Sequence, residues 1–368
     1  MGGDIGNHAL KLVAGVGNRL YLVNAVKEVS VGTERKSLGE DEQILDTLDV
    51  FIRCPHLPEL HERRFFVGNL AIGKNEYQVS PDTRKMENPL ILVPFLTGLA
   101  LQSNQRDEHL LVEATMGLPM AEFLEKSQRK DFEQKITGEY EIEFVSTAKM
   151  EGWKVKIQLK PSLSPEGMAV ILHQMTDRFG RNIRPDWNGQ AMGAIDIGGF
   201  STDMSAIGTD HRPDPDLCEG FQLGTITAID EIIKEINRIY KIKFPRHMIE
   251  KTITTDNCQL QLGAKKIDIH DLVESNFRSI SNQIAQAVLE VAKKPKAAMI
   301  HRYFVFGGGA LKYQKFMEKE LQERMYSELL WLTTDPKETL FLNAESFYRL
   351  AMMKSIRDAS HMLKAKEA

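Results

Sequence analysis

Short apolar runs that end at polar or glycine-rich turns recur along the chain, and their periods predict both strands and helices. Residues 10–13 and 20–23 flank a Gly-Val-Gly-Asn turn, which predicts a β-hairpin. Apolar side chains at helical spacing predict helices over 225–240 and 269–293. A further helix is predicted over 120–135, and a strand over 153–159.

One stretch, residues 194–208, combines this pattern with residues suited to chemistry. An apolar run ends at the carboxylate of Asp196, two glycines follow shortly after, and a strand-like pattern then resumes. Glycine lets backbone N–H groups close on an oxyanion, and the hydroxyls of Ser201 and Thr202 add donors. Asp196 also suits a hydrated Mg²⁺, which takes few protein carboxylates. The alternative is an ordinary hairpin in which Asp196 only caps the turn.

The pattern Asp-Ile-Gly occurs twice, as Asp4-Ile5-Gly6 and as Asp196-Ile197-Gly198. A repeat about 190 residues apart predicts two related domains that face each other across one polyanion. A third glycine cluster, Gly307-Gly308-Gly309-Ala310, follows an apolar strand and opens a helical stretch. Glycines at such a junction allow close approach of a flat or anionic ligand, and the helix N-terminus favours negative charge.

In this order and at these spacings, the three motifs resemble those of the actin-like ATPase superfamily. Within it, the chain is similar to the prokaryotic actin-like proteins of the plasmid-segregation (ParM-type) and archaeal-actin group. The similarity rests on residues 115–123, Thr-Met-Gly-Leu-Pro-Met-Ala-Glu-Phe, which resemble the strand-to-helix junction of that group. The resemblance covers essentially the whole chain. It implies an α/β actin-like ATPase fold, in which two related ribonuclease-H-like domains, each with a small subdomain, surround a nucleotide cleft.

The resemblance also implies domain limits. Residues 1–185 form the N-terminal domain, with a small variable subdomain at about 30–90. Residues 186–345 form the C-terminal domain, with a small subdomain at about 241–270, and residues 346–368 form a helix that docks back on the first domain. Only three residues precede Asp4, where the family usually carries several apolar ones. We therefore expect either a start upstream of Met1 or a short first strand.

Catalytic roles follow from the matching motifs. By resemblance, Asp4 and Asp196 are the catalytic carboxylates, and both organise Mg²⁺ through water. A Glu or Gln after a proline orients the attacking water in the family, and Ser162 stands at that position here, so the rate of hydrolysis is left open. Glu166 lies four residues further on and is the other candidate for this role. Its alternative role is to cap a helix.

The resemblance places the nucleotide on the glycine turns and on the helix that starts after Gly224. The implied nucleotide-binding residues are Gly6, Asn7, His8, Lys11, Gly198, Gly199, Phe200, Ser201, Gly224, Thr225, Gly307, Gly308, Gly309 and Ala310. For Lys11 the alternative is a solvated charge on a strand, and for Thr225 it is a simple helix N-cap.

Composition limits the function classes. The 368 residues carry a net charge of −4, so no basic surface indicates direct binding of nucleic acid. Cys54, Cys218 and Cys258 are scattered without metal-site spacing, which fits a reduced, cytoplasmic protein. The sequence shows no signal peptide and no apolar run of the roughly 18–20 residues that span a membrane.

The expected function is that of a filament-forming actin-like protein that binds and hydrolyses ATP, or GTP, with Mg²⁺. By resemblance, its partners are other copies of itself and an adaptor protein that binds plasmid DNA during segregation. No membrane contact is expected. The alternatives are a small-molecule kinase and a non-polymerising ATPase of the same superfamily. A kinase needs a general base near an acceptor pocket, and the sequence offers no candidate for one.

Overall fold

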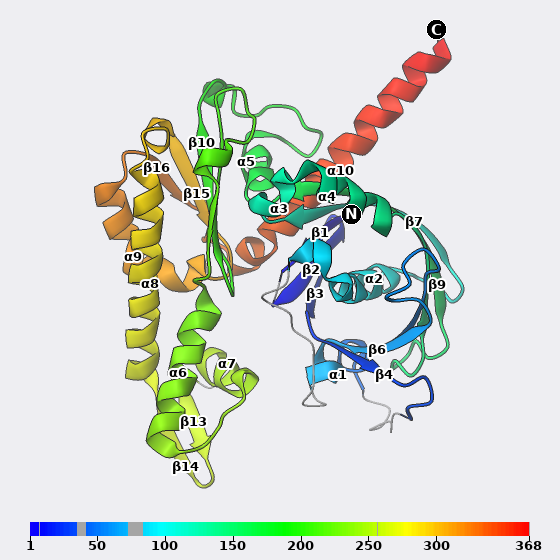
Figure 1. Cartoon of the computed structure of the whole chain (residues 1–368), viewed down its shortest axis with the longest axis horizontal. Helices are drawn as coiled ribbons and strands as arrows, with labels where there is room; N and C mark the ends of the chain where they lie inside the picture. Colours follow the sequence, from blue (N-terminus) through cyan, green and yellow to red (C-terminus); the bar gives the residue numbers. More distant parts are fainter. Residues whose placement is uncertain (7, 35–41, 73–83, 256, 368) are drawn as a thin grey trace. The chain divides into compact units, whose positions relative to one another are not determined.

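The computed structural model describes residues 1–6, 8–34, 42–72, 84–255 and 257–367 and divides the chain into two compact units. Unit 1 comprises Met1–Trp187 and Phe341–Ala368, and unit 2 comprises Asn188–Leu340 (Figure 1). These divisions lie a few residues from the expected limits at 185 and 345. None of the described helices combines the length and the apolar composition that crossing a bilayer requires.

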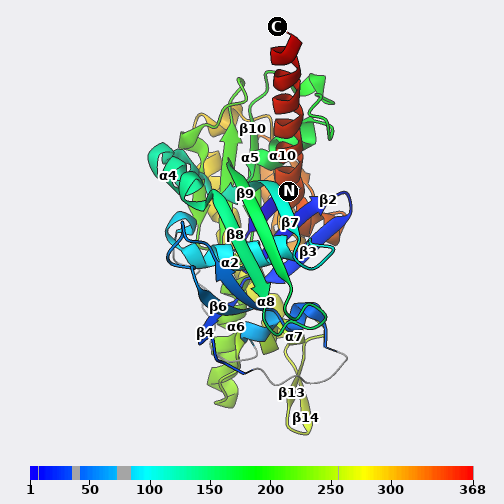
Figure 2. The same ribbon diagram turned by 90° about the vertical axis from the view of Figure 1, so that its right-hand side faces the viewer.

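Unit 1 is built on one sheet, which has nine strands among the described residues. These strands are β1 (Gly2–Ile5), β2 (Ala9–Gly15), β3 (Asn18–Val23), β4 (Val26–Val29), β5 (Asp49–Arg53), β6 (Arg63–Val67), β7 (His109–Leu118), β8 (Gly138–Phe144) and β9 (Lys154–Pro165). Their order in the sheet is β3-β2-β1-β7-β9-β8-β5-β6-β4. β1 is antiparallel to β2 and parallel to β7, and β7 is parallel to β9. Figure 2 shows β7, β9 and β8 as neighbours.

Short helices connect these strands and pack on them. They are α1 (Asn69–Ile72), α2 (Leu92–Ala100), α3 (Met120–Leu124), α4 (Lys126–Ile136) and α5 (Met168–Met175), with 3-10 turns η1 (Ile44–Asp46), η2 (Lys85–Glu87), η3 (Pro89–Ile91) and η4 (Pro185–Trp187). Every residue of α2 is buried, and this helix contributes Phe95, Leu96 and Leu99 to the apolar core of unit 1.

The last helix, α10 (Pro336–Glu367), begins well before the expected start at residue 346. From residue 341 onward it belongs to unit 1. The Ser346 hydroxyl lies 3.1 Å from Nδ1 of His173, and Arg349 donates to the His173 carbonyl at 2.7 Å. These bonds fasten α10 to α5.

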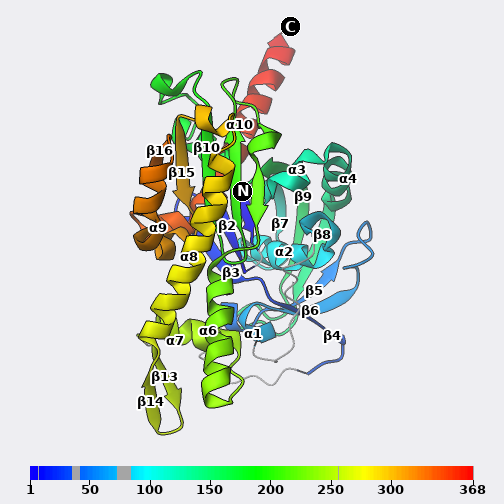
Figure 3. The same cartoon turned by 60° about the vertical axis from the view of Figure 1, so that its left-hand side comes forward.

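Unit 2 has a five-stranded sheet with the order β12-β11-β10-β15-β16 among its described residues. The strands are β10 (Met192–Ile197), β11 (Thr202–Ile207), β12 (Glu219–Phe221), β15 (Arg302–Phe306) and β16 (Glu328–Trp331). The helices are α6 (Thr225–Tyr240), α7 (Arg246–Thr254), α8 (His270–Ala292) and α9 (Ala310–Arg324), with short turns η5 (Pro215–Leu217) and η6 (Ala297–Met299). Figure 3 shows α8 beside α9, and the hairpin β13 (Gln259–Leu262)–β14 (Lys265–Asp268) at the end of α8.

The same five-strand arrangement occurs in both units. The order β3-β2-β1-β7-β9 of unit 1 matches β12-β11-β10-β15-β16 of unit 2, and corresponding neighbours run in the same relative directions. Asp4 and Asp196 each stand one residue before the end of the first strand, on β1 and β10. The internal repeat predicted from the two Asp-Ile-Gly motifs is therefore confirmed as a repeat of structure.

Two predicted elements differ from the observed ones. The helix expected over residues 120–135 is two helices, α3 and α4, separated at Glu125. The strand expected over 153–159 continues as β9 to Pro165. Pairing with β8 ends at Leu159, so the prolines at 161 and 165 lie where β7 is the only neighbour of β9 among the described strands. Proline is tolerated there because its missing N–H can face the unpaired side.

Candidate functional site

In unit 1, the β1–β2 hairpin places a carboxylate and an ammonium side by side. Asp4 is buried, and Lys11 lies opposite it in the strand register. Nζ of Lys11 donates to Oδ2 of Asp4 at 2.7 Å. The turn is held by Gly6, whose N–H donates to the Ala9 carbonyl at 3.1 Å, and by Asn24, whose side chain donates to the Gly6 carbonyl at 2.9 Å.

Two further predicted residues belong to this turn. His8 follows it and accepts a bond at its carbonyl from the Asn24 backbone at 3.0 Å. Asn7 lies outside the described residues, so its predicted role in the turn stays a prediction.

A buried ion pair lies where β7 and β9 end. Nζ of Lys85 is 2.5 Å from Oε1 of Glu166, and the two side chains are 9% and 11% exposed. Burial works against the charged ammonium, but the carboxylates of Glu166, Asp4 and Glu122 outweigh it. The pKa of Lys85 is therefore raised above its ordinary value. Lys85, Glu166 and Asp4 thus form one electrostatic cluster at the carboxyl ends of parallel strands, where α/β sheets commonly bind ligands.

Glu122 fixes the segment that carries Lys85. Its two carboxylate oxygens accept bonds from the backbone N–H groups of Lys85 and Met86, at 3.1 and 3.0 Å. Glu122 is the acidic residue of the predicted strand-to-helix junction over residues 115–123. The buried carboxylate of that motif therefore anchors the backbone of η2.

Ser162 and Glu166 occupy different environments. Ser162 lies within β9 opposite Thr115, and their hydroxyl oxygens are 2.9 Å apart. Glu166 follows the end of β9, and its N–H donates to the Leu118 carbonyl at 2.9 Å. Glu166, rather than Ser162, is the residue placed beside Lys85.

In unit 2, the three predicted glycine segments meet through their backbones. The Gly309 N–H donates to the Ile197 carbonyl at 2.7 Å, and the Ile226 N–H at the start of α6 donates to the Gly199 carbonyl at 2.8 Å. A Cβ on Gly224 would lie 2.3 Å from the Gly199 oxygen. Only glycine permits this approach, so the hairpin turn, the start of α6 and the turn before α9 form one cluster.

Asp196 lies against this cluster. Gly307 has φ of +99°, and a Cβ there would be 2.4 Å from Oδ1 of Asp196 and 2.5 Å from the Ile197 carbonyl oxygen. Gly308 and the buried Ala310 complete the turn, and Ala310 is the first residue of α9. The predicted carboxylate and the predicted triple-glycine turn are therefore neighbours.

The hydroxyls expected to face a ligand have partners within the unit. Ser201 donates to Oδ2 of Asp203 at 2.7 Å, and Thr202 donates to the Leu223 carbonyl at 2.8 Å. Gly198 donates its N–H to the Ser201 carbonyl at 2.8 Å and closes the turn. Gly224 is the N-cap of α6, so Thr225 is its first helical residue rather than its cap.

Unit 2 also has charged residues outside the predicted motifs, on α6, α7 and α9. Arg246 on α7 makes bonds of 2.9–3.0 Å with the Asp230 carboxylate, and its guanidinium lies 5.7 Å from the Phe200 ring centre. Burial raises the pKa of Glu250, while the charges of Arg246 and Lys312 act in the opposite direction. Burial also lowers the pKa of Lys312, which Glu250 partly offsets.

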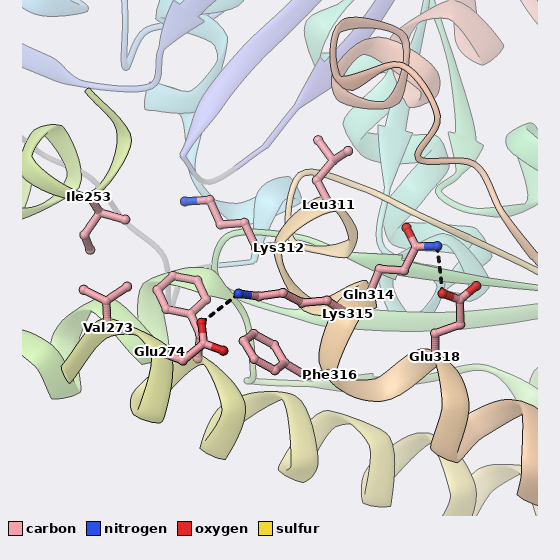
Figure 4. Close-up of a pocket in the computed structure, with 10 residues that line it drawn as sticks. Ile253, Val273, Glu274, Leu311, Lys312, Gln314, Lys315, Phe316 and Glu318 are labelled. Atoms are coloured by element: carbon pink, nitrogen blue, oxygen red, sulfur yellow. Dashed lines mark hydrogen bonds and ion pairs between the residues drawn. The ribbon is translucent and has the colours of Figure 1, made fainter. Parts of the chain in front are cut away.

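A pocket of about 480 Å³ opens beside the start of α9 (Figure 4). Its lining is apolar on the side of α7 and α8, with Ile253, Val273 and Phe277. Lys312 lies 5.5 Å from the centre of the Phe277 ring, and Lys315 pairs with Glu274 at 2.7 Å. The pocket can hold a flat group between an apolar wall and cationic side chains. The turn 307–310, at which the sequence predicts close approach of a flat or anionic ligand, directly precedes α9 and the pocket beside it.

The described side chains that could bind a metal ion are few. No group of three His, Cys, Asp or Glu side chains within the described ranges is arranged to hold an ion. Asp4 and Asp196 offer one carboxylate in each unit. A single carboxylate of this kind suits Mg²⁺ that keeps most of its waters and binds substrate phosphates, because that ion needs only one or two protein carboxylates.

Comparisons with known proteins agree with this architecture. No curated protein matches the sequence at a significant level. Among solved structures, the actin-like protein Alp7A has a TM-score of 0.77 at 17% identity, covering 99% of this chain and 98% of that one. Bacillus thuringiensis ParM with AMPPNP has a TM-score of 0.71 at 20% identity, covering 96% and 98%. Ta0583, an archaeal actin homolog, has a TM-score of 0.70 at 16% identity, covering 96% and 98%.

Two family descriptions match successive parts of the sequence. The N-terminal domain of actin-like proteins matches residues 2–168, and the C-terminal domain of archaeal MreB-like actin homologues matches residues 194–323. The two matches correspond to the two units and include both Asp-Ile-Gly hairpins and the triple-glycine turn. The chain therefore belongs to the actin-like proteins and has the actin-like fold of the ParM and archaeal-actin group.

Proposed function

We propose that this protein binds and hydrolyses Mg–ATP and that the nucleotide controls its assembly into filaments. The observation that carries the proposal is the duplicated sheet, with a carboxylate one residue before the end of the first strand in both copies. The proposal assigns both hairpins to the phosphates of one nucleotide. Phosphoryl transfer needs mainly positioning and charge neutralisation, which such turns can supply.

In unit 1, the proposal gives Asp4 and Lys11 the task of placing charge at the phosphates. The pair is 2.7 Å apart, so the ammonium is already held by the carboxylate. Bound Mg²⁺ would neutralise phosphate charge, and Asp4 and Asp196 would hold its waters. Glu166 would orient the attacking water, since its carboxylate stands at the strand ends beside Lys85.

In unit 2, the proposal assigns the nucleoside to the pocket beside α9. Leu311 and Lys312 on the first turn of α9 line it together with Phe277. Of the two nucleotides, we propose ATP, because Bacillus thuringiensis ParM was solved with AMPPNP, an ATP analogue. A glycine-lined approach to the start of α9 suits a ligand that continues toward phosphates.

The filament and its cargo are further parts of the proposal. Assembly with other copies of this chain is supported by its membership of the actin-like proteins. Movement of plasmid DNA through an adaptor protein rests on the resemblance to the ParM group. The net charge of −4 favours an adaptor over direct DNA contact.

The test is to add Mg–ATP to the purified protein and to follow light scattering and phosphate release together, with electron microscopy of the product. We expect scattering to rise, filaments to appear and phosphate to follow. ADP formation that needs an added small-molecule acceptor and releases no free phosphate, with flat scattering, would indicate a kinase instead. Phosphate release without filaments would indicate a non-polymerising ATPase.

A further inference from the structure

Lys85 is a buried lysine, and burial of a charged side chain needs a physical reason. It is one of few charged residues in the core of the described chain, at 7% exposure, and it comes from a 3-10 turn rather than a sheet strand. Its ammonium is 2.5 Å from the Glu166 carboxylate, and Asp4 contributes to its electrostatic environment. Lys85 therefore faces the residues to which the phosphate chemistry is assigned.

Stability alone is a weak reason for such a pair. Withdrawing two charges from water is costly, and well-packed apolar residues of similar volume are often equally or more stabilising. The position of the pair is specific, because Glu166 directly follows β9 and the η2 turn that carries Lys85 is fixed by Glu122. A chain of polar contacts thus runs from Glu122 through the backbone of Lys85 to the Glu166 carboxylate.

The aliphatic stem of Glu166, its Cβ and Cγ atoms, is confined by β7. A Cβ at Gly117 would lie 2.5 Å from Cζ of Phe347 and 3.0 Å from Cγ of Glu166, so the glycine at this point of β7 leaves room for the Phe347 ring and for that stem. With the stem against β7 and one carboxylate oxygen on Lys85, the side chain has little freedom. Its other oxygen is then held in a defined orientation.

We propose that Lys85 is a positioning residue, which holds the Glu166 carboxylate in the orientation that water attack on the γ-phosphate requires. This inference rests on the proposed ATPase function and adds a residue to it. Lys85 acts through Glu166 and does not itself bind the phosphate. Any change that displaces the η2 turn would release Glu166 and slow hydrolysis.

The experiment compares Lys85→Gln, Lys85→Arg, Glu166→Gln and the double variant Lys85→Gln/Glu166→Gln in the full chain. The control is Lys160→Gln, because Lys160 on β9 also pairs with a glutamate, Glu113, at 2.9 Å, but on the exposed surface. Steady-state phosphate release gives kcat and KM, and titration with a fluorescent non-hydrolysable ATP analogue gives Kd. Thermal unfolding of each variant shows whether it is folded.

The expected result for Lys85→Gln is a fall in kcat of at least tenfold, with KM and Kd within about twofold of wild type. Lys85→Arg should retain more activity than Lys85→Gln, since it keeps the charge. In the Glu166→Gln background, the second change should alter kcat less than twofold, because the residue through which Lys85 acts is already gone. Lys160→Gln should match wild type.

Other outcomes overturn the inference. If Lys85→Gln lowers kcat by the same factor in the wild-type and the Glu166→Gln backgrounds, Lys85 acts independently of Glu166. If Lys85→Gln raises the Kd for the ATP analogue, Lys85 is a phosphate ligand. If Lys85→Gln leaves a buried unpaired carboxylate and does not fold, the double variant, in which both charges are removed, and Lys85→Arg still carry the comparison. A wild-type protein that binds no ATP analogue and releases no phosphate would contradict the proposed function itself, and this inference with it.

Discussion

A Cβ atom on Gly307 would lie 2.4 Å from Oδ1 of Asp196, so the triple-glycine turn and the candidate catalytic carboxylate of unit 2 exclude any larger residue between them. The backbone at Gly307 is left-handed, with φ of +99°, and the neighbouring Gly309 donates its N–H to the end of β10. Asp196 is thus held by a turn whose conformation depends on glycine.

Gly307→Ala should lower both stability and turnover. The alanine must adopt a strained φ or displace Asp196, and we expect a loss of about 1–3 kcal/mol in the free energy of unfolding. Urea denaturation measures this loss. Gly308→Ala is the matched control for stability, because the nearest atom to a Cβ there is Leu340 Cδ1 at 3.8 Å and its φ is not left-handed. Equal losses in the two variants would show that the contact with Asp196 carries no strain.

Asp196→Ala should separate binding from chemistry. If Asp196 holds the waters of Mg²⁺ and the attacking water, its removal should lower kcat at least a hundredfold and leave ATP affinity within about tenfold. Phosphate release and titration with a fluorescent ATP analogue measure the two quantities. Asp210→Ala, on an exposed turn of the same unit, serves as the control. Unchanged turnover in Asp196→Ala would remove this residue from the site.

The buried pair in the outer part of the unit 1 sheet should be structural. Arg64 makes two bonds to the Asp49 carboxylate, at 2.8 and 2.7 Å, and Asp49 is fully buried. Asp49→Ala leaves an uncompensated buried guanidinium and should cost about 3–5 kcal/mol of unfolding free energy. Glu28→Ala breaks the exposed pair with Arg63 and should cost less than about 1 kcal/mol. Similar losses in denaturant titrations of the two variants would contradict this difference.

Glu250 should make the protein less stable as pH rises. Burial raises the pKa of this carboxyl in the folded state, with Arg246 and Lys312 opposing the shift. The folded state therefore binds the proton more tightly than the unfolded state, and stability falls as pH rises from the ordinary Glu range through the raised pKa. Glu250→Gln removes this penalty. Its melting temperature should exceed that of wild type at pH 8, and the difference should shrink toward pH 5. A constant difference would mean that the carboxyl does not titrate in this way.

The sequence was most informative where the backbone itself makes the site. The glycines at 224, 307 and 309 stand out in the sequence because close backbone contacts exclude a Cβ atom at each of them, and in unit 2 these contacts join the three segments. The repeat of Asp-Ile-Gly was likewise sufficient to predict two related domains, since each copy ends the first strand of the same five-strand arrangement.

The sequence was least informative where a side chain gains its role from distant partners. Lys85 stands in a polar stretch without a period. Its ammonium lies beside Glu166 in a turn whose backbone N–H groups, at Lys85 and Met86, are bonded to the distant Glu122. The extent of β9 was also hidden, because Pro161 and Pro165 resemble a strand end when the neighbouring strands are unknown. The shorter predicted strand put Ser162 in a junction, whereas it lies inside β9.

Because β9 extends to Pro165, the two candidates for orienting the attacking water occupy different positions: Ser162 lies inside the strand and Glu166 just after it. The Ser162 hydroxyl lies 2.9 Å from that of Thr115 within the sheet, whereas Glu166 stands past the strand end and pairs with Lys85. Glu166→Gln should therefore lower kcat at least a hundredfold with little change in ATP affinity. Ser162→Ala should change kcat less than threefold and cost about 1 kcal/mol of stability through the lost hydrogen bond. Single-turnover phosphate release under saturating ATP measures the chemical step for both. The reverse pattern, a large effect of Ser162→Ala and a small one of Glu166→Gln, would return the role to Ser162, because the residue that orients the water must limit the rate when it is removed.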